Sequence, residues 1–151
     1  MTSEAPNRLR RAEAVLQFRT SRLVLVAERC VDTHNLTAIL RTAELMGIQN
    51  VYTIDQDLDI SKQQRSTVSS GANFWVDVHN FKCTESCVNQ LKKDGFEIWA
   101  TDLGDGATSL APSDIPPIPS KLAIVMGRET DGISDQMRAL SDRLVWLHRV
   151  I

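Results

Sequence analysis

One polar segment that could bind a ligand follows an apolar run late in the sequence. Gly127, Glu129 and Gly132 form the pattern Gly-x-Glu-x-x-Gly directly after residues 122–126. A glycine lets a ligand approach the backbone, a carboxylate can hold a polar group, and a second glycine permits a tight turn before a helix. Strand-to-glycine turns also serve packing, and Glu129 could simply be solvated. The motif alone leaves both interpretations open.

Asn35 and Arg41 are a second pair of candidate site residues, placed on the opening turns of a predicted helix. They are six residues apart, so they do not share one helix face. A short polar side chain such as Asn35 near a helix start is normally a cap. Arg41 lies between Leu40 and Ala43 in an otherwise apolar helix, where it is either a surface arginine or a cation placed for a ligand.

The cysteines and histidines do not form a metal set. Cys83 and Cys87 share a predicted helix face, but no second cysteine pair or histidine completes a zinc site, and Cys30 is distant. No metal-ligand spacing links the histidines, which are His34, His79 and His148. A Walker loop and a full Gly-x-Gly-x-x-Gly are also absent from the sequence. We therefore expect core thiols and no metal.

The charge is distributed unevenly along the chain. The formal net charge is -2, which counts against a broadly basic nucleic-acid footprint. However, residues 1–50 carry seven arginines against five acidic residues. The arginines at the start of this part are either a solvated helix face or a local binding surface.

Alternating apolar runs and amphipathic stretches place these residues on an α/β fold. The predicted strands are residues 23–27, 50–54, 74–78, 96–101, 122–126 and 144–147, with a short one at 108–110 in the connection 104–120. The predicted helices are residues 8–19, 35–46, 83–94 and a helix capped by Ser134 that runs to Leu140, with a helical turn and loop in 61–73. This alternation predicts a mainly parallel sheet with helices on both faces.

Length and composition indicate one globular domain. The chain has 151 residues, of which 42% are hydrophobic and 24% charged. No apolar run approaches the roughly 20 residues that span a bilayer, and the N-terminus does not look like a secretion signal. Three cysteines, an odd number, do not suggest a disulfide framework. We expect a reducing compartment, the cytoplasm or an organelle, and no membrane partner.

Taken in order, four segments resemble the SpoU/TrmH-type RNA 2'-O-ribose methyltransferases of the SPOUT superfamily. They are Asn35-x-x-Ala38-x-x-Arg41-Thr42-Ala43-x-x-x-Gly47, Gly71-Ala72-x-x-Trp75-Val76, Ala100-Thr101-x-Leu103 and Ile124-x-Met126-Gly127-x-Glu129-x-x-Gly132-Ile133. The likeness runs from about residue 8 to residue 147 and is strongest to the branch that methylates a tRNA guanosine in the D-loop. It divides the chain into a basic helical segment, 1–21, and a SPOUT-like domain, 22–151.

The resemblance implies a methyltransferase with S-adenosylmethionine as the donor. Arg41 would position the ribose 2'-hydroxyl, with Asn35 holding the backbone of that site. An arginine stays protonated, so orienting the hydroxyl and countering a phosphate suit it better than removing a proton. The implied donor-binding residues are Thr101, Leu103, Met126, Gly127, Glu129, Gly132 and Leu147. The implied RNA-binding residues are Arg8, Arg10, Arg11, Arg19 and Arg22. The substrate would be a tRNA, with ribosomal RNA as an alternative, and the enzyme would act as a homodimer.

The end of the sequence departs from the family pattern. The family has a third motif after the last strand, where it closes a knot around the donor, whereas here Leu147 is followed only by His148, Arg149, Val150 and Ile151. We therefore expect a donor pocket that lacks one wall and a truncated knot. The competing expectation is a non-catalytic remnant that binds RNA or a protein partner, because basic residues and most of the sheet remain.

Overall fold

The computed structural model describes residues 6–30, 32–55, 75–104, 106–113, 115–128 and 130–146. Several predicted features lie outside these residues: the helical turn and loop in 61–73, Gly71, Ala72, Glu129 and Leu147.

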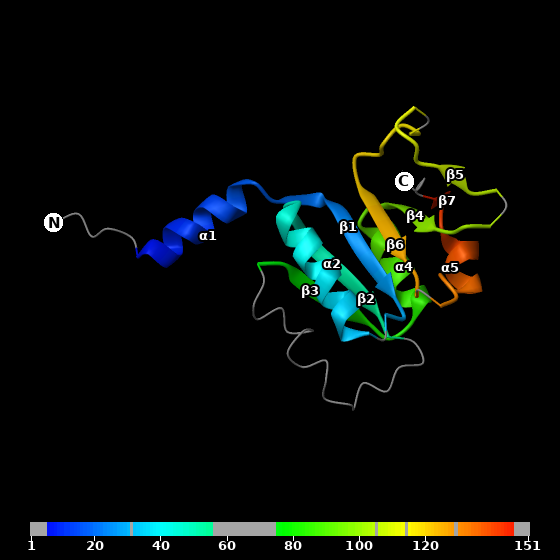
Figure 1. The fold of residues 1–151 in the computed structure, drawn as a ribbon, viewed down its shortest axis with the longest axis horizontal. Helices are drawn as coiled ribbons and strands as arrows, with labels where there is room; N and C mark the ends of the chain where they lie inside the picture. Colours follow the sequence, from blue (N-terminus) through cyan, green and yellow to red (C-terminus); the bar gives the residue numbers. More distant parts are fainter. Residues whose placement is uncertain are drawn as a thin grey trace.

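The described residues form a parallel sheet of seven strands with helices packed on it (Figure 1). The strands are β1 (Thr20–Glu28), β2 (Ile48–Ile54), β3 (Asp77–Phe81), β4 (Glu97–Thr101), β5 (Thr108–Ser109), β6 (Leu122–Met126) and β7 (Arg143–Trp146). The helices are α1 (Asn7–Gln17), α2 (Thr33–Leu45), α4 (Thr84–Lys93) and α5 (Asp135–Leu140). The strand order is β3-β2-β1-β6-β4-β7-β5, and the strand pairs are parallel throughout. The predicted α/β class is confirmed.

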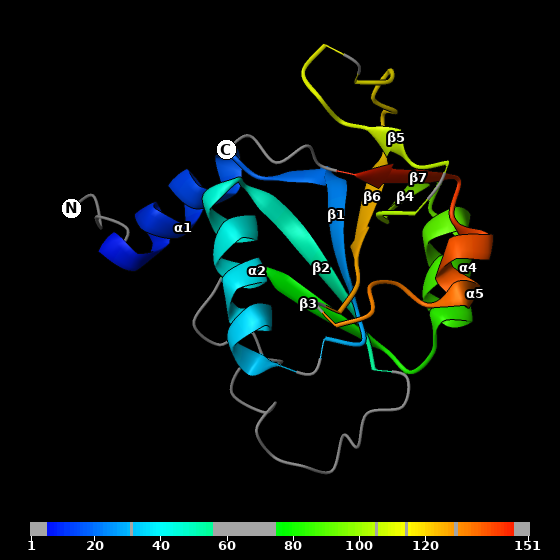
Figure 2. The same cartoon turned by 45° about the vertical axis from the view of Figure 1, so that its right-hand side comes forward.

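The central strand β1 is buried on both faces, which explains its continuous apolar sequence. Val24 and Val26 pack in the core formed with α4 and α5, whereas Leu25 and Ala27 pack in the core formed with α2. Figure 2 shows the sheet between α2 on one side and α4 with α5 on the other. Because strand side chains alternate between faces, only an unbroken apolar run can fill both cores.

Helix α2 begins two residues earlier than the sequence predicts. Asp32 is its N-cap, and the Asp32 carboxylate accepts a 2.8 Å hydrogen bond from the His34 amide. Asn35 therefore lies inside the first turn, half-buried, and the expectation that it caps the helix is wrong. The helix ends as predicted before Gly47, which has φ +74° and no room for a side chain against the carbonyl of Phe18.

The edge strand β3 starts three residues later than predicted. It pairs Val78 with Val51 and Phe81 with Ile54 of β2. Its side chains are exposed or only half-buried because it lies at the sheet edge, so hydrophobicity marks it poorly. The predicted bounds of 74–78 are wrong for this reason.

The first helix is separate from the main layers. α1 extends away from the sheet in both views (Figures 1 and 2). β1 already starts at Thr20, inside the segment 1–21 that was predicted as an N-terminal unit. Three arginines of that segment, Arg8, Arg10 and Arg11, lie on this projecting helix, whereas Arg19 lies between α1 and β1.

Candidate functional site

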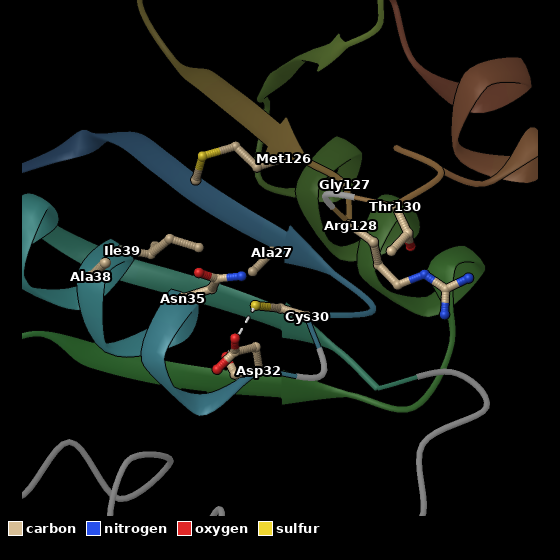
Figure 3. Close-up of a pocket in the computed structure, with 10 residues that line it drawn as sticks. All are labelled: Ala27, Cys30, Asp32, Asn35, Ala38, Ile39, Met126, Gly127, Arg128 and Thr130. Carbon is tan, nitrogen blue, oxygen red and sulfur yellow. Dashed lines mark hydrogen bonds between the residues drawn. The ribbon is translucent and has the colours of Figure 1, made fainter.

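The carboxyl ends of β1 and β6 form the crevice where a ligand site is expected. β1 and β6 are neighbours in the sheet. The chain leaves β1 for β2 on one side of this pair and leaves β6 for β7 on the other side, so the two connections run in opposite directions. In open parallel sheets such a switch point is the usual binding position. A cavity of about 550 Å³ lies there. It is lined by Ala27, Cys30, Asp32, Asn35, Ala38, Ile39, Met126, Gly127, Arg128 and Thr130 (Figure 3).

The cavity brings together residues of two segments that are about 90 positions apart in the sequence. Asn35 comes from the first turn of α2, and its amide faces the cavity (Figure 3). Met126 and Gly127 come from the end of β6. Ala27 and Ile39 add apolar surface, so the site combines a mostly apolar wall with few polar groups, as small-molecule sites do.

The loop from Gly127 to Gly132 is held by its own backbone. Arg128 and Gly132 exchange two amide-to-carbonyl hydrogen bonds of 3.1 and 2.8 Å. A side chain at 127 would collide with the backbone of Gly132 and Ile133, so the packing of the loop requires this glycine, which also lines the cavity. Gly132 has φ +73° with open space where a side chain would lie. The turn requires a glycine at this position, as predicted, and the missing side chain leaves the backbone of Gly132 accessible.

Charged side chains brace the same loop. Arg128 donates to both carboxylate oxygens of Asp131, at 2.8 and 2.6 Å. This hydrogen bonding lowers the pKa of Asp131 to about 2. Arg29, with φ +55° at the end of β1, lies 3.9 Å from Asp131 and donates weakly to the carbonyl of Gly132 at 3.5 Å. These contacts fix the described residues of the loop to one another and to the end of β1.

Thr101 lies beside this site on β4. The register of β4 and β6 places Thr101 next to Met126, and the Thr101 hydroxyl donates to the carbonyl of Val125 at 2.9 Å. Leu103 follows with a side chain that is 92% exposed. Among the described residues, neither of them lines the 550 Å³ cavity.

The turn between Thr101 and Leu103 is fixed by an ion pair. Arg138 of α5 donates to both carboxylate oxygens of Asp102, at 2.9 and 3.3 Å. The hydrogen bond from Arg138 lowers the pKa of Asp102. The carboxyl end of β4 is thus tied to α5, the helix that also follows the glycine loop.

Arg41 lies on the exposed surface of α2, beyond the residues that line the cavity. The six residues that separate it from Asn35 put the two side chains on different parts of the helix. Because its side chain is exposed, it carries no burial cost that would force a structural role on it.

The arginines predicted to bind RNA fall into two groups. Arg8, Arg10 and Arg11 are exposed on α1. Arg19 is half-buried and donates to the Gln49 side chain at 2.7 Å and to the Ile48 carbonyl at 3.1 Å, and Arg22 donates to the Ser120 carbonyl at 2.9 Å. Arg19 and Arg22 thus have structural partners that sequence reasoning missed.

Two of the cysteines differ in chemistry. Cys87 is buried, and burial raises the pKa of its thiol to about 12. Cys83 is half-buried at the N-cap of α4, where hydrogen bonding with Ser86 holds its pKa below the ordinary value.

Within the described ranges, no group of three or more histidine, cysteine or acidic residues could hold a metal ion. None of the described helices is both long and apolar enough to cross a bilayer.

Sequence reasoning missed Glu28, the last residue of β1. Its side chain is 0% exposed and accepts hydrogen bonds from Thr84 and Ser134. The signal was a charged residue at the end of a strand that is buried on both faces. A search for hydrophobic patterns stops at such a residue and assigns it no role.

The parallel sheet, the cavity at its switch point and the ordered glycine loop after β6 define an α/β protein with a ligand site at its strand ends. Residues 22–149 match the model of the SpoU rRNA Methylase family, and the chain belongs to this family.

Individual proteins agree with this membership. The chain is 30% identical over 139 residues to a tRNA (guanosine(18)-2'-O)-methyltransferase of Borreliella burgdorferi, covering 89% of this chain and 60% of that protein. Its fold resembles the A. aeolicus TrmH/SpoU tRNA modifying enzyme, with a TM-score of 0.74 at 22% identity over 95% of this chain and 71% of that one. It also resembles an AdoMet-bound rRNA methyltransferase from Sinorhizobium meliloti, with a TM-score of 0.68 at 19% identity over 89% of this chain and 50% of that one. The chain thus spans 60% of the length of the Borreliella relative.

Proposed function

We propose that the protein methylates the ribose 2'-oxygen of an RNA, with a tRNA guanosine as the target and S-adenosylmethionine as the donor. The observation that carries this proposal is the meeting of Asn35 with Met126 and Gly127 in one cavity. These residues belong to the first and the last of the four segments that resemble the family. The names of the relatives support the same substrate and donor.

The described residues fit the donor at the strand ends of β4 and β6. Thr101 and Met126 are neighbours there, and the exposed Leu103 offers apolar surface for the adenine. The open backbone at Gly132 lets a polar group reach the loop. Thr101, Leu103, Met126, Gly127 and Gly132 would hold the donor. Glu129 and Leu147 lie outside the described residues, and their donor role stays a prediction.

When bound, S-adenosylmethionine supplies an electrophilic methyl group on a sulfonium. The donor would supply this methyl group to the ribose 2'-oxygen, with the thioether as the leaving group, and solvent water would take the hydroxyl proton, because Arg41 is already protonated. The exposed Arg41 guanidinium orients this hydroxyl and neutralises the adjacent phosphate, because its planar fork can contact both. Asn35 holds the cavity side of the reacting nucleotide.

RNA contacts extend the site along α1. Its exposed arginines concentrate positive charge on one helix of a chain whose formal net charge is -2. The protein acts as a homodimer in this proposal, as the family resemblance implies, and its location in the cytoplasm stays a prediction.

Calorimetry with S-adenosylmethionine, followed by titration with unmodified tRNA, tests the proposal. Donor binding at micromolar concentration together with salt-sensitive tRNA binding is the expected result. RNA binding with no donor binding would contradict the transferase and favour the non-catalytic RNA-binding protein instead.

A further inference from the structure

Glu28 places a carboxylate inside the protein where two helices and the glycine loop converge. One carboxylate oxygen, Oε1, accepts from the Ser134 amide at 2.6 Å. The other, Oε2, accepts from the Ser134 hydroxyl and from the Thr84 hydroxyl, each at 2.7 Å. The side chain is 0% exposed, so these donors replace the water that a carboxylate otherwise requires.

Ser134 connects Glu28 to the glycine loop. It follows Gly132 and Ile133 directly and is the N-cap of α5, where its hydroxyl oxygen also accepts from the Met137 amide at 3.1 Å. Two of the three hydrogen bonds to Glu28 thus fix one residue, at the point where the loop becomes a helix. The third, from Thr84, fixes the first residue of α4 and makes no contact with the loop through this bond.

Stability alone does not favour a carboxylate at this position. The preceding residues of β1, Val24 to Ala27, are apolar and fill both cores. Replacing a buried charged group by well-packed apolar residues is often neutral or stabilising. The carboxylate does one thing that an apolar side chain cannot, because it accepts from the amide and the hydroxyl of Ser134 together.

Resting on the proposed function, we infer that Glu28 is a positioning residue for donor binding. Through Ser134 it fixes the C-terminal end of the Gly127–Gly132 loop, where Gly132 has open space beside its backbone for a polar group of the donor. Arg29 assists from the next position of the chain by its contact with the Gly132 carbonyl. The end of β1 therefore sets the shape of the Gly127–Gly132 loop, which follows β6.

Four variants separate positioning from stability. Ser134→Ala removes the hydroxyl on the loop side, which also caps α5 through the Met137 amide. Thr84→Val is the control for the bond to Glu28, since it removes the hydroxyl that donates to the same oxygen at the same distance from α4. Glu28→Leu removes the acceptor altogether. Glu28→Gln keeps an oxygen for the Ser134 amide, while its NH2 group can donate to hydroxyls that turn to accept, so it should rescue.

The first measurement is hydrogen exchange of the peptide that covers residues 127–134, made on the protein without donor. Glu28→Leu and Ser134→Ala should speed this exchange by at least about tenfold, whereas Thr84→Val and Glu28→Gln should leave it within about threefold of the unchanged protein. Equal loop exchange in Ser134→Ala and Thr84→Val would overturn the inference. So would unchanged exchange in a folded Glu28→Leu variant.

The second measurement is the Kd for S-adenosylmethionine, with melting temperatures of the same samples. Glu28→Leu and Ser134→Ala should weaken donor binding at least about tenfold, and the double variant no further than the stronger single one, because both remove one coupled contact. Thr84→Val should lower the melting temperature with donor affinity changed less than about twofold. Additive losses, or losses that follow melting temperature alone, would make Glu28 purely structural.

The two proposals fail differently. If the unchanged protein does not bind the donor, the proposed function is wrong, while loop exchange still decides whether Glu28 fixes the loop. If the donor binds and the loop exchange of the variants shows no contrast, the inference about Glu28 is wrong and the proposed function stands.

Discussion

Arg41 is the residue on which the proposed chemistry depends most. Its side chain is exposed on α2, so Arg41→Ala should leave the melting temperature close to unchanged. In a form of the protein that transfers methyl groups, we expect Arg41→Ala to lower the rate of transfer at least about a hundredfold. This corresponds to a loss of roughly 2.7 kcal/mol of transition-state stabilisation. Arg41→Lys should rescue little, because a point charge replaces a planar fork.

The control for Arg41 is Lys93→Ala, which removes an exposed cation from the last turn of α4. Single-turnover methylation and a melting curve are measured for each variant. A large loss of melting temperature in Arg41→Ala, with activity falling only in proportion to folded protein, would make Arg41 a structural residue.

The two glycines of the loop should respond differently to alanine. Gly127→Ala forces a side chain into the backbone of Gly132 and Ile133, so we expect a loss of about 2–3 kcal/mol in the free energy of unfolding. Gly132→Ala has space but an unfavourable φ, so about 1 kcal/mol is expected. Denaturant unfolding gives both values, and a larger loss at 132 would contradict the packing described for the loop.

At the scale of elements, the glycine loop gains acid sensitivity from Asp131. The hydrogen bond from Arg128 lowers the pKa of Asp131 to about 2, from an ordinary 3.8. A folded-state pKa below the unfolded one means that its stabilising contribution is complete above pH 3.8 and is lost as the pH falls towards 2. The carboxylate is half-exposed, so the contribution is small.

Asp131→Asn should therefore lower stability at neutral pH and lose its effect in acid. Urea midpoints for the two proteins, measured from pH 7 down to pH 2, provide the test. We expect a constant difference above pH 5 that shrinks below pH 4. A difference that grows in acid would show that Arg128 does not stabilise the charged form of Asp131.

The arginines on α1 and the arginine just before β1 are expected to have different roles, in RNA binding and in stability respectively. Replacing Arg8, Arg10 and Arg11 together by glutamine should lower tRNA affinity with little change in melting temperature. The slope of log affinity against log salt should fall in magnitude by about 2, since each phosphate contact contributes roughly 0.7–0.9. Arg19→Gln should instead lower the melting temperature, because Arg19 holds Gln49 and the Ile48 carbonyl. An unchanged salt slope in the triple variant would exclude α1 from the RNA surface.

At the scale of the whole molecule, the sequence predicts best what is buried. The central strands are predictable because strands covered on both faces need continuous apolar runs, and β6 has the predicted bounds. The Ser134 cap was also predictable, because a serine before a helix has a local hydrogen-bonding role. Edge strand β3 was misplaced because half of its surface faces water.

The long-range polar contacts could not be predicted. Glu28 meets Ser134 across 106 positions, and Arg22 meets Ser120 across 98. Such partners are set by the order of strands in the sheet, which local patterns do not determine. The cavity follows the same rule, since Asn35 was identified but its meeting with Met126 required the pairing of β1 with β6.

The most direct test of the account is transfer of a deuterated methyl group from labelled S-adenosylmethionine to unmodified tRNA. After nuclease digestion, mass spectrometry of the nucleosides locates the label on base or ribose. We predict label on the ribose of guanosine with the unchanged protein, and at least about a hundredfold less with Arg41→Ala. Donor binding with no labelled ribose, label on a base, or equal labelling by the Arg41→Ala variant would contradict the account.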